Sequence, residues 1–126
     1  EKITRDDGKV EERLVLRIPP ALAPVKLAVF PLLRKDGLPE KARAIMDDLK
    51  LDFKCEYEEK DSIGRRYRRH DAIGTPFCIT IDHQTLEDNT VTIRYRDTME
   101  QERVDASRLK EILEPKVSMR TLLSKI

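Results

Sequence analysis

The chain is poor in the residues that mark several protein classes. It holds no tryptophan and only two cysteines and four glycines among 126 residues. Two cysteines make no disulfide framework, so Cys55 and Cys78 are interpreted as buried thiols of a reducing compartment. No run of 18 apolar residues occurs, and the first residues are too polar for a signal peptide. We therefore expect a soluble, cytoplasmic domain without membrane contact.

Charge is abundant but almost balanced. The 25 Lys and Arg oppose 24 Asp and Glu, which leaves a formal net charge of +1. This balance excludes a polycation that coats nucleic acid without specificity. If nucleic acid binds, the positive charge must be concentrated on one part of the surface. The length fits one domain, and the absence of an initial methionine suggests a fragment.

Apolar periodicity predicts alternating strands and helices. Strands are predicted over 25–33, 53–57, 76–81, 91–95 and 100–104, and helices over 38–49, 62–74 and 109–115. Ser62 is a good N-cap and Gly74 a good C-cap for the second helix, and Pro115 should end the last one. A turn is predicted at 87–89. The early strands should be parallel and the last two should form a hairpin, which gives a mixed sheet covered by helices.

The two ends of the chain show weaker patterns. Residues 1–12 have no periodicity and are interpreted as a mobile lead-in, and 14–18 could form a short strand before Pro19 and Pro20. The tail after Pro115 contains enough apolar residues to dock on another surface.

Residues 61–77 form the most informative stretch. Four arginines fall within five positions, and between Lys60 and Asp71 five basic side chains oppose two acidic ones, a local charge of +3. On a helix the apolar face carries Ile63, Tyr67 and His70. The opposite face carries Arg65, Arg68 and Arg69, and Arg66 flanks it.

This stretch permits two interpretations. Guanidinium groups suit phosphate, which favours a nucleic-acid or phosphate site, whereas an ordinary solvated face is also common. Arg94 and Arg96, on the polar side of a later strand, would extend a basic surface if the sheet brings them to the same side. Tyr67 could stack a base, but its helical phase favours packing in the core.

Other kinds of site find no support in the sequence. The gaps between Cys55, His70, Cys78 and His83 match no zinc motif, and no phosphate-binding glycine loop accompanies residues 71–74. Neither a nucleophile elbow nor a distinctive carboxylate pair is present. We expect no catalytic, cofactor-binding or metal-binding residues in this chain.

Several blocks occur in the order and spacing of one known family. They are PALAPVK (20–26), KDGLPEKA (35–42), IGRRYRR (63–69), DAIGTPFC (71–78), TLEDNTVT (85–92) and RDTMEQ (96–101). The frame R-Y-x-x-x-D-x-x-G-x-P, from Arg66 to Pro76, is similar to threonyl-, prolyl- and histidyl-tRNA synthetase anticodon domains. The complete set resembles class II glycyl-tRNA synthetases of the homodimeric type, in their C-terminal anticodon-binding domain.

This resemblance implies a fold, a partner and a parent enzyme. The fold would be α/β, with a mixed, roughly five-stranded sheet and three main helices. Residues 1–19 would be the connector from a missing catalytic domain, 20–115 the anticodon-binding domain, and 116–126 a tail. The domain would recognise the anticodon stem-loop of glycine tRNA. The homodimeric parent would use ATP and magnesium for aminoacylation, and this fragment, which lacks the catalytic motifs, would be inactive and monomeric.

The expected RNA-binding residues come from the arginine helix and the edge of the sheet. We expect backbone contacts from Arg65, Arg66, Arg68 and Arg69, and base contacts from Arg94, Arg96, Asp97 and Thr98. Asp71 should orient arginines or cap a turn, and Arg66 could instead brace the helix against it. The alternatives are an accessory protein-interaction domain of the same fold and an anticodon domain for threonine or proline tRNA.

Overall fold

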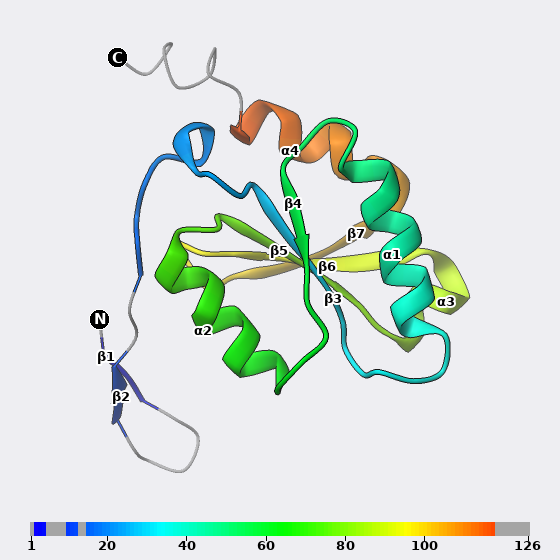
Figure 1. Cartoon of the computed structure of the whole chain (residues 1–126), viewed down its shortest axis with the longest axis horizontal. Helices are drawn as coiled ribbons and strands as arrows, with labels where there is room; N and C mark the ends of the chain where they lie inside the picture. The colour runs from blue at the N-terminus through cyan, green and yellow to red at the C-terminus, as the bar shows by residue number, and fades with distance from the viewer. Residues whose placement is uncertain (1, 5–9, 13–14, 118–126) are drawn as a thin grey trace.

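A five-stranded mixed sheet forms the centre of the protein. The computed structural model describes residues 2–4, 10–12 and 15–117 (Figure 1). The sheet has the order β4-β3-β5-β6-β7. Its strands are β3 (Leu27–Pro31), β4 (Cys55–Tyr57), β5 (Phe77–Ile81), β6 (Thr90–Tyr95) and β7 (Gln101–Asp105). β3 is parallel to β4 and β5, whereas β5–β6 and β6–β7 are antiparallel, so the predicted mixed sheet is confirmed.

Three longer helices and one short helix accompany the sheet. They are α1 (Leu38–Leu49), α2 (Ile63–Ile73), α3 (His83–Asp88) and α4 (Leu109–Val117), with 3-10 turns η1 (Pro20–Leu22) and η2 (Ala106–Arg108). The three longer helices were predicted, but α3 lies partly where we expected only a turn. Its start is a capping box between Asp82 and Thr85, and its end is Asn89 at φ 61°. Leu86 is the one apolar residue of this helix and is half-exposed, so the segment shows no apolar periodicity.

The helices lie on both faces of the sheet (Figure 1). Alternate strand residues define the two faces, since Leu27 and Val29 belong to one cluster and Ala28 and Phe30 to another. The larger cluster packs against α1 and α4, and α2 covers the smaller one. The larger core consists of Leu27, Val29, Leu38, Ala42, Leu49, Phe53, Phe77, Ile79, Ile81, Val91, Ile93, Leu109 and Leu113.

Three predictions at the ends of the chain were wrong. Pro115 lies within α4, which continues to Val117; an exposed proline in the last turn removes only one hydrogen bond there. Val15–Ile18 form no strand, and Leu14 lies outside the described residues. Within 1–12, where no regular structure was expected, β1 (Lys2–Thr4) pairs antiparallel with β2 (Val10–Glu12). Residues 118–126 of the predicted tail lie outside the described part.

Side chains and backbone fasten the segment before β3 to the body of the fold. The Leu16 amide donates to the Asp71 carbonyl at 2.9 Å, and Arg96 Nη2 donates to the Ile18 carbonyl at 2.7 Å. Lys26 Nζ donates to the carbonyl oxygens of Pro20, Ala21 and Ala23 at 2.7–2.9 Å and so holds η1. Over the described residues, none of the helices combines the length and apolar character needed to cross a bilayer.

Candidate nucleic-acid interface

Helix α2 is fixed at both ends by residues that the sequence predicted. Ser62 Oγ accepts a hydrogen bond from the Arg65 amide at 3.3 Å and caps the first turn. Gly74 ends the helix at φ 85°. This left-handed conformation favours glycine, and a Cβ there would make a tight contact of 3.2 Å with a Leu16 side-chain carbon. The orientation of the arginines is therefore set by a helix with defined ends.

The inward face of α2 packs on β3 and β5. The Tyr67 and His70 rings lie 5.9 and 5.4 Å from the Phe30 ring, and the Tyr67 and Thr80 hydroxyls share a hydrogen bond of 2.7 Å. The prediction that Tyr67 packs in the core is confirmed. A core position also removes Tyr67 from the residues available for base stacking.

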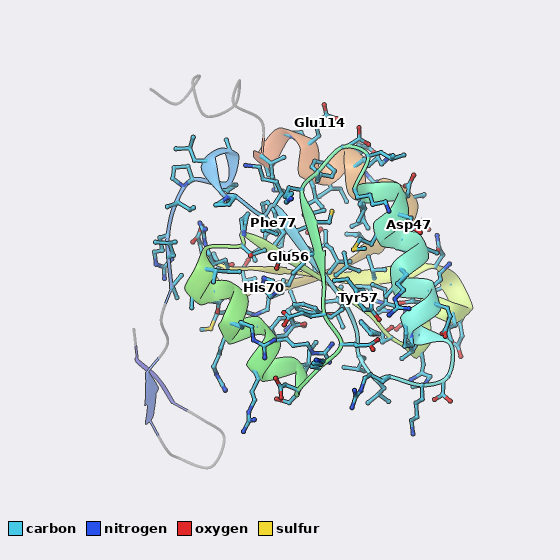
Figure 2. All side chains as sticks on the ribbon, in the orientation of Figure 1. Asp47, Glu56, Tyr57, His70, Phe77 and Glu114 are labelled. Carbon is cyan, nitrogen blue, oxygen red and sulfur yellow. The ribbon has the colours of Figure 1, made fainter. Side chains whose placement is uncertain are left out.

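His70 links α2 to the end of β4. Figure 2 labels His70 on the side of α2 that faces the sheet. Its Nε2 lies 2.6 Å from Glu58 Oε2 and its Nδ1 lies 2.9 Å from Thr75 Oγ1. Because an ionised Glu58 can only accept, we assign the proton to Nε2, and the Thr75 hydroxyl then donates to Nδ1. Burial lowers the pKa of His70 below its usual value. His70 is thus a neutral structural group that connects the helix to Glu58.

Two predicted arginines, Arg65 and Arg69, are exposed on the outward face of α2, and Arg68 is half-buried. Arg69 forms ion pairs with Glu58 and with Asp61, the latter at 2.6 Å between Nη2 and Oδ2. The guanidinium of Arg69 is therefore already neutralised by neighbouring carboxylates. This pairing was not foreseen from the sequence, although Glu58 and Asp61 both lie just before the helix.

Arg66, predicted to contact RNA, is buried instead. Only 2% of the residue is exposed, and its guanidinium donates to the carbonyl oxygens of Pro31, Leu32 and Glu58 at 2.8–3.3 Å. Burial lowers the pKa of Arg66. It closes the ends of β3 and β4, so neither an RNA contact nor the alternative brace against Asp71 describes its position.

The predicted sheet-edge arginines are also interior. Arg94 Nη1 and Nη2 donate to the two carboxylate oxygens of Asp71 at 2.9 and 3.1 Å, and the guanidinium lies 4.6 Å from the Tyr67 ring centre. Arg96 donates to the Gly74 and Ile18 carbonyls and to Asp97. The sheet does bring both arginines to the α2 side, as hypothesised, but both side chains are buried there. Asp71 orients an arginine, as predicted.

Asp97 and Thr98 are exposed in the turn between β6 and β7. Asp97 binds Arg96 and Arg17, and Thr98 Oγ1 accepts from the Glu100 amide at 3.2 Å. Since Arg96 reaches the Gly74 carbonyl, this turn lies near the C-terminal end of α2, whereas Arg65 lies in its first turn. The structure therefore separates the remaining exposed candidates into two places.

One polar cluster on the α2 side of the sheet was not predicted from the sequence. Arg103 of β7 donates to both carboxylate oxygens of Asp82 at 2.7 and 2.9 Å and to the hydroxyls of Thr90 and Thr92. In the strand register Arg103 lies opposite Thr92, which lies opposite Thr80. The alternation of β6 indicated a polar face there, but nothing linked it to Asp82, which lies 21 residues before Arg103.

The chain is similar in sequence to a known domain family and to curated proteins. The family model described as "Anticodon binding domain" matches residues 26–116. Curated glycine–tRNA ligases from Treponema pallidum, Streptomyces coelicolor and Caldanaerobacter subterraneus are 50%, 51% and 57% identical over 107, 106 and 107 residues. These alignments cover 84–85% of this chain but 23% of each relative, so the chain spans about a quarter of their length. The described sheet, its helices and most of the polar groups above fall inside the matched range. The chain belongs to the anticodon-binding domain family.

Proposed function

We propose that this domain binds the anticodon stem-loop of glycine tRNA, as part of a longer glycyl-tRNA synthetase of the homodimeric class II type. The observation that supports this most directly is α2, which is held in the core by Tyr67 and His70 and carries arginines on its outer face. The relatives with about 50% identity are named glycine–tRNA ligases. In this proposal ATP and magnesium are used by the rest of the longer protein, in the cytoplasm.

Phosphate attraction would come from the outward face of α2. Arg65 is exposed in the first turn, where the positive end of the helix dipole adds to its charge. Arg68 and Arg69 follow along the same face. Arg66, Arg94 and Arg96 leave the set of proposed contacts, because each already donates to buried carbonyl or carboxylate oxygens.

Base recognition requires polar groups near this helix that can reach an unstacked loop. Asp97 and Thr98 are exposed near the end of α2, and Thr92 and Arg103 lie on the same face of the sheet as α2. Both places offer donors and acceptors of the kind that read base edges. The buried Arg94–Asp71 pair would keep this face in place rather than touch a base.

The test is a titration of the chain with glycine tRNA at two salt concentrations. A second RNA carries replacements at the second and third anticodon positions. Recognition by this domain predicts a loss of about 1–3 kcal/mol per changed base, with salt dependence from the arginine contacts. Equal, weak binding of both RNAs would show backbone attraction alone and would contradict anticodon recognition by the isolated domain.

The same experiment separates the alternatives. Threonine and proline tRNAs serve as competitors, and either of them binding better than glycine tRNA would change the proposed amino-acid identity. A protein-interaction domain predicts no anticodon discrimination and little salt dependence of tRNA binding. Sedimentation equilibrium of the same sample tests whether the chain is a monomer, as we propose, and the longer protein is the appropriate sample for dimerisation.

A further inference from the structure

A pocket, separate from the outer face of α2, opens beside β4. It has a volume of about 310 Å³ and is lined by Arg43, Tyr57, Glu58, Glu59 and Lys60. Figure 2 shows Tyr57 on the side of β4 that faces α1, the helix that supplies Arg43. The parallel strands β3 and β4 both end at this edge, which is the edge where open α/β sheets commonly bind ligands.

The centre of the pocket is a stacked pair of side chains. The Arg43 guanidinium carbon lies 4.9 Å from the centre of the Tyr57 ring. The Tyr57 hydroxyl donates to Glu59 Oε2 at 2.6 Å, which fixes the ring edge. The Arg43 side chain is 60% exposed, which leaves its guanidinium accessible to a ligand, and its Nη2 lies 3.9 Å from Glu59 Oε2. Guanidinium planes of this kind stack against nucleobases.

The rim of the pocket carries a hydrogen-bond acceptor, Glu59, and a cation, Lys60. Among the described residues only Oε2 of Glu59 is engaged, so Oε1 can accept a hydrogen bond from an exocyclic amino group. Lys60 is exposed and forms no ion pair with the part of the chain that the structure describes. A volume near the lower limit of about 300 Å³ for small-ligand pockets suits one nucleotide rather than a duplex.

The pocket is continuous with the arginine helix through Glu58. That residue lines the pocket, and its carboxylate pairs with Arg69 and His70 of α2. Because α1 and α2 cover opposite faces of the sheet, an RNA strand on the outer face of α2 would reach the pocket by crossing Glu58 at the end of β4. The two features share a residue but use different arginines.

We propose that the Arg43–Tyr57 pocket binds one unstacked nucleotide of the RNA, with its base stacked on the guanidinium of Arg43. The base would have an exocyclic amino group, as in cytosine or adenine, that donates to Glu59. The proposal rests on the proposed RNA-binding function and adds to it a base-binding place outside α2. Lys60 at the rim would face the phosphate of the same nucleotide.

The test compares Arg43→Lys with wild-type protein. Lysine keeps the charge but loses the planar stacking surface, so a stacking role predicts about a 5- to 100-fold weaker affinity for glycine tRNA. The matched control is Arg108→Lys in η2, an exposed arginine paired only with Glu111 among the described residues, which should change affinity less than twofold. Glu59→Gln should reduce the preference for cytosine or adenine over uracil at the bound position.

A set of tRNAs, each with one abasic nucleotide in the anticodon loop, identifies the base. One abasic position should weaken binding to wild-type protein strongly and have little further effect on Arg43→Lys. Unchanged affinity of Arg43→Lys, or the same abasic profile for both proteins, would overturn the pocket. If Arg65→Ala still weakens binding in that case, the proposed function survives without the pocket. Absence of any tRNA binding by the wild-type chain would overturn both.

Discussion

Asp71 of α2 and Arg94 of β6 form a buried, bidentate ion pair. The two oxygen–nitrogen distances are 2.9 and 3.1 Å, and the side chains are 1% and 8% exposed. Arg94 also lies against the Tyr67 ring, so the pair joins the helix to the sheet at two points. Together with the packing of Tyr67 and His70 on Phe30, the charged pair fixes how α2 is rotated on the sheet and which of its arginines face solvent.

Breaking this pair should destabilise the fold strongly. Asp71→Ala leaves the Arg94 guanidinium buried without its counter-charge, and we expect the free energy of unfolding to fall by about 3–5 kcal/mol. Urea denaturation followed by circular dichroism measures the change. Arg108→Ala, which removes an exposed pair with Glu111, should change it by at most about 0.5 kcal/mol. A double variant, Asp71→Leu with Arg94→Met, should recover much of the loss, and equal instability of both variants would contradict this account.

Adjacent arginines of α2 should give opposite phenotypes. Arg65→Ala should leave stability within about 0.5 kcal/mol, weaken tRNA binding and reduce the salt slope by roughly 0.7–0.9. Arg66→Ala leaves the Pro31 and Leu32 carbonyls without their donors and should cost about 1–3 kcal/mol of stability. Its salt slope, measured well below the unfolding temperature, should equal that of wild type. A reduced slope for Arg66→Ala would mean that this guanidinium reaches phosphate.

Asp61 should restrain RNA binding through its ion pair with Arg69. Asp61→Asn weakens the competition for that guanidinium and removes a negative charge near the RNA, so tRNA affinity should rise a few-fold. Asparagine tolerates the positive φ of 68° at this position, so the backbone should not change. Asp47→Asn on α1, which removes the same charge beside Lys50, is the control and should have no effect on affinity. Unchanged affinity for Asp61→Asn would contradict a restraint of RNA binding by Asp61.

Stability should depend on pH through His70. Its pKa is lowered by burial, so below about pH 6.5 the unfolded chain binds a proton that the folded chain does not. The free energy of unfolding should therefore decrease from pH 7 towards pH 5, by at most about 1.4 kcal/mol per pH unit. The lowered pKa values of Asp82 and Asp88 act only at more acidic pH.

Urea denaturation between pH 5 and pH 7.5 measures this dependence. His70→Gln should flatten the profile in that range. Nitrogen-15 NMR of the two histidines provides an independent check, because His70 should keep the Nε2-protonated neutral form at a pH where an exposed histidine is charged. A profile that stays the same in His70→Gln would contradict the assignment.

Local pattern predicted the elements of this fold well. The alternation of Val91, Ile93 and Tyr95 located β6, and Ser62 and Gly74 located both ends of α2 because each cap acts within one turn. Helix α3 was not predicted, because it is stabilised by the Asp82–Thr85 capping box and not by an apolar face that periodicity could reveal. The predicted end of the last helix at Pro115 was wrong, because a helix can continue through an exposed proline in its last turn.

Local pattern could not predict which arginine side chains are buried. Helical phase placed Arg66 beside the outward face, and nothing in the sequence indicated that it would reach the Pro31 and Leu32 carbonyls, 35 and 34 residues away. Arg94 and Asp71 are 23 residues apart, and only the register of β5 with β6 brings them together. A long guanidinium suits an interior carbonyl as well as a phosphate, so residue type alone did not separate the two roles.

The attachment of residues 15–18 has a mechanical consequence. Leu16 is bonded to the Asp71 carbonyl, Ile18 to Arg96, and Arg17 to Asp97, so three consecutive positions are tied to the two elements that carry the arginines and the β6–β7 turn. A flexible joint here would absorb any rotation between this domain and whatever is covalently attached before it. The anchored segment 15–18 would instead pass a rotation of the preceding polypeptide directly to α2. RNA bound on α2, as proposed, would therefore turn together with that polypeptide.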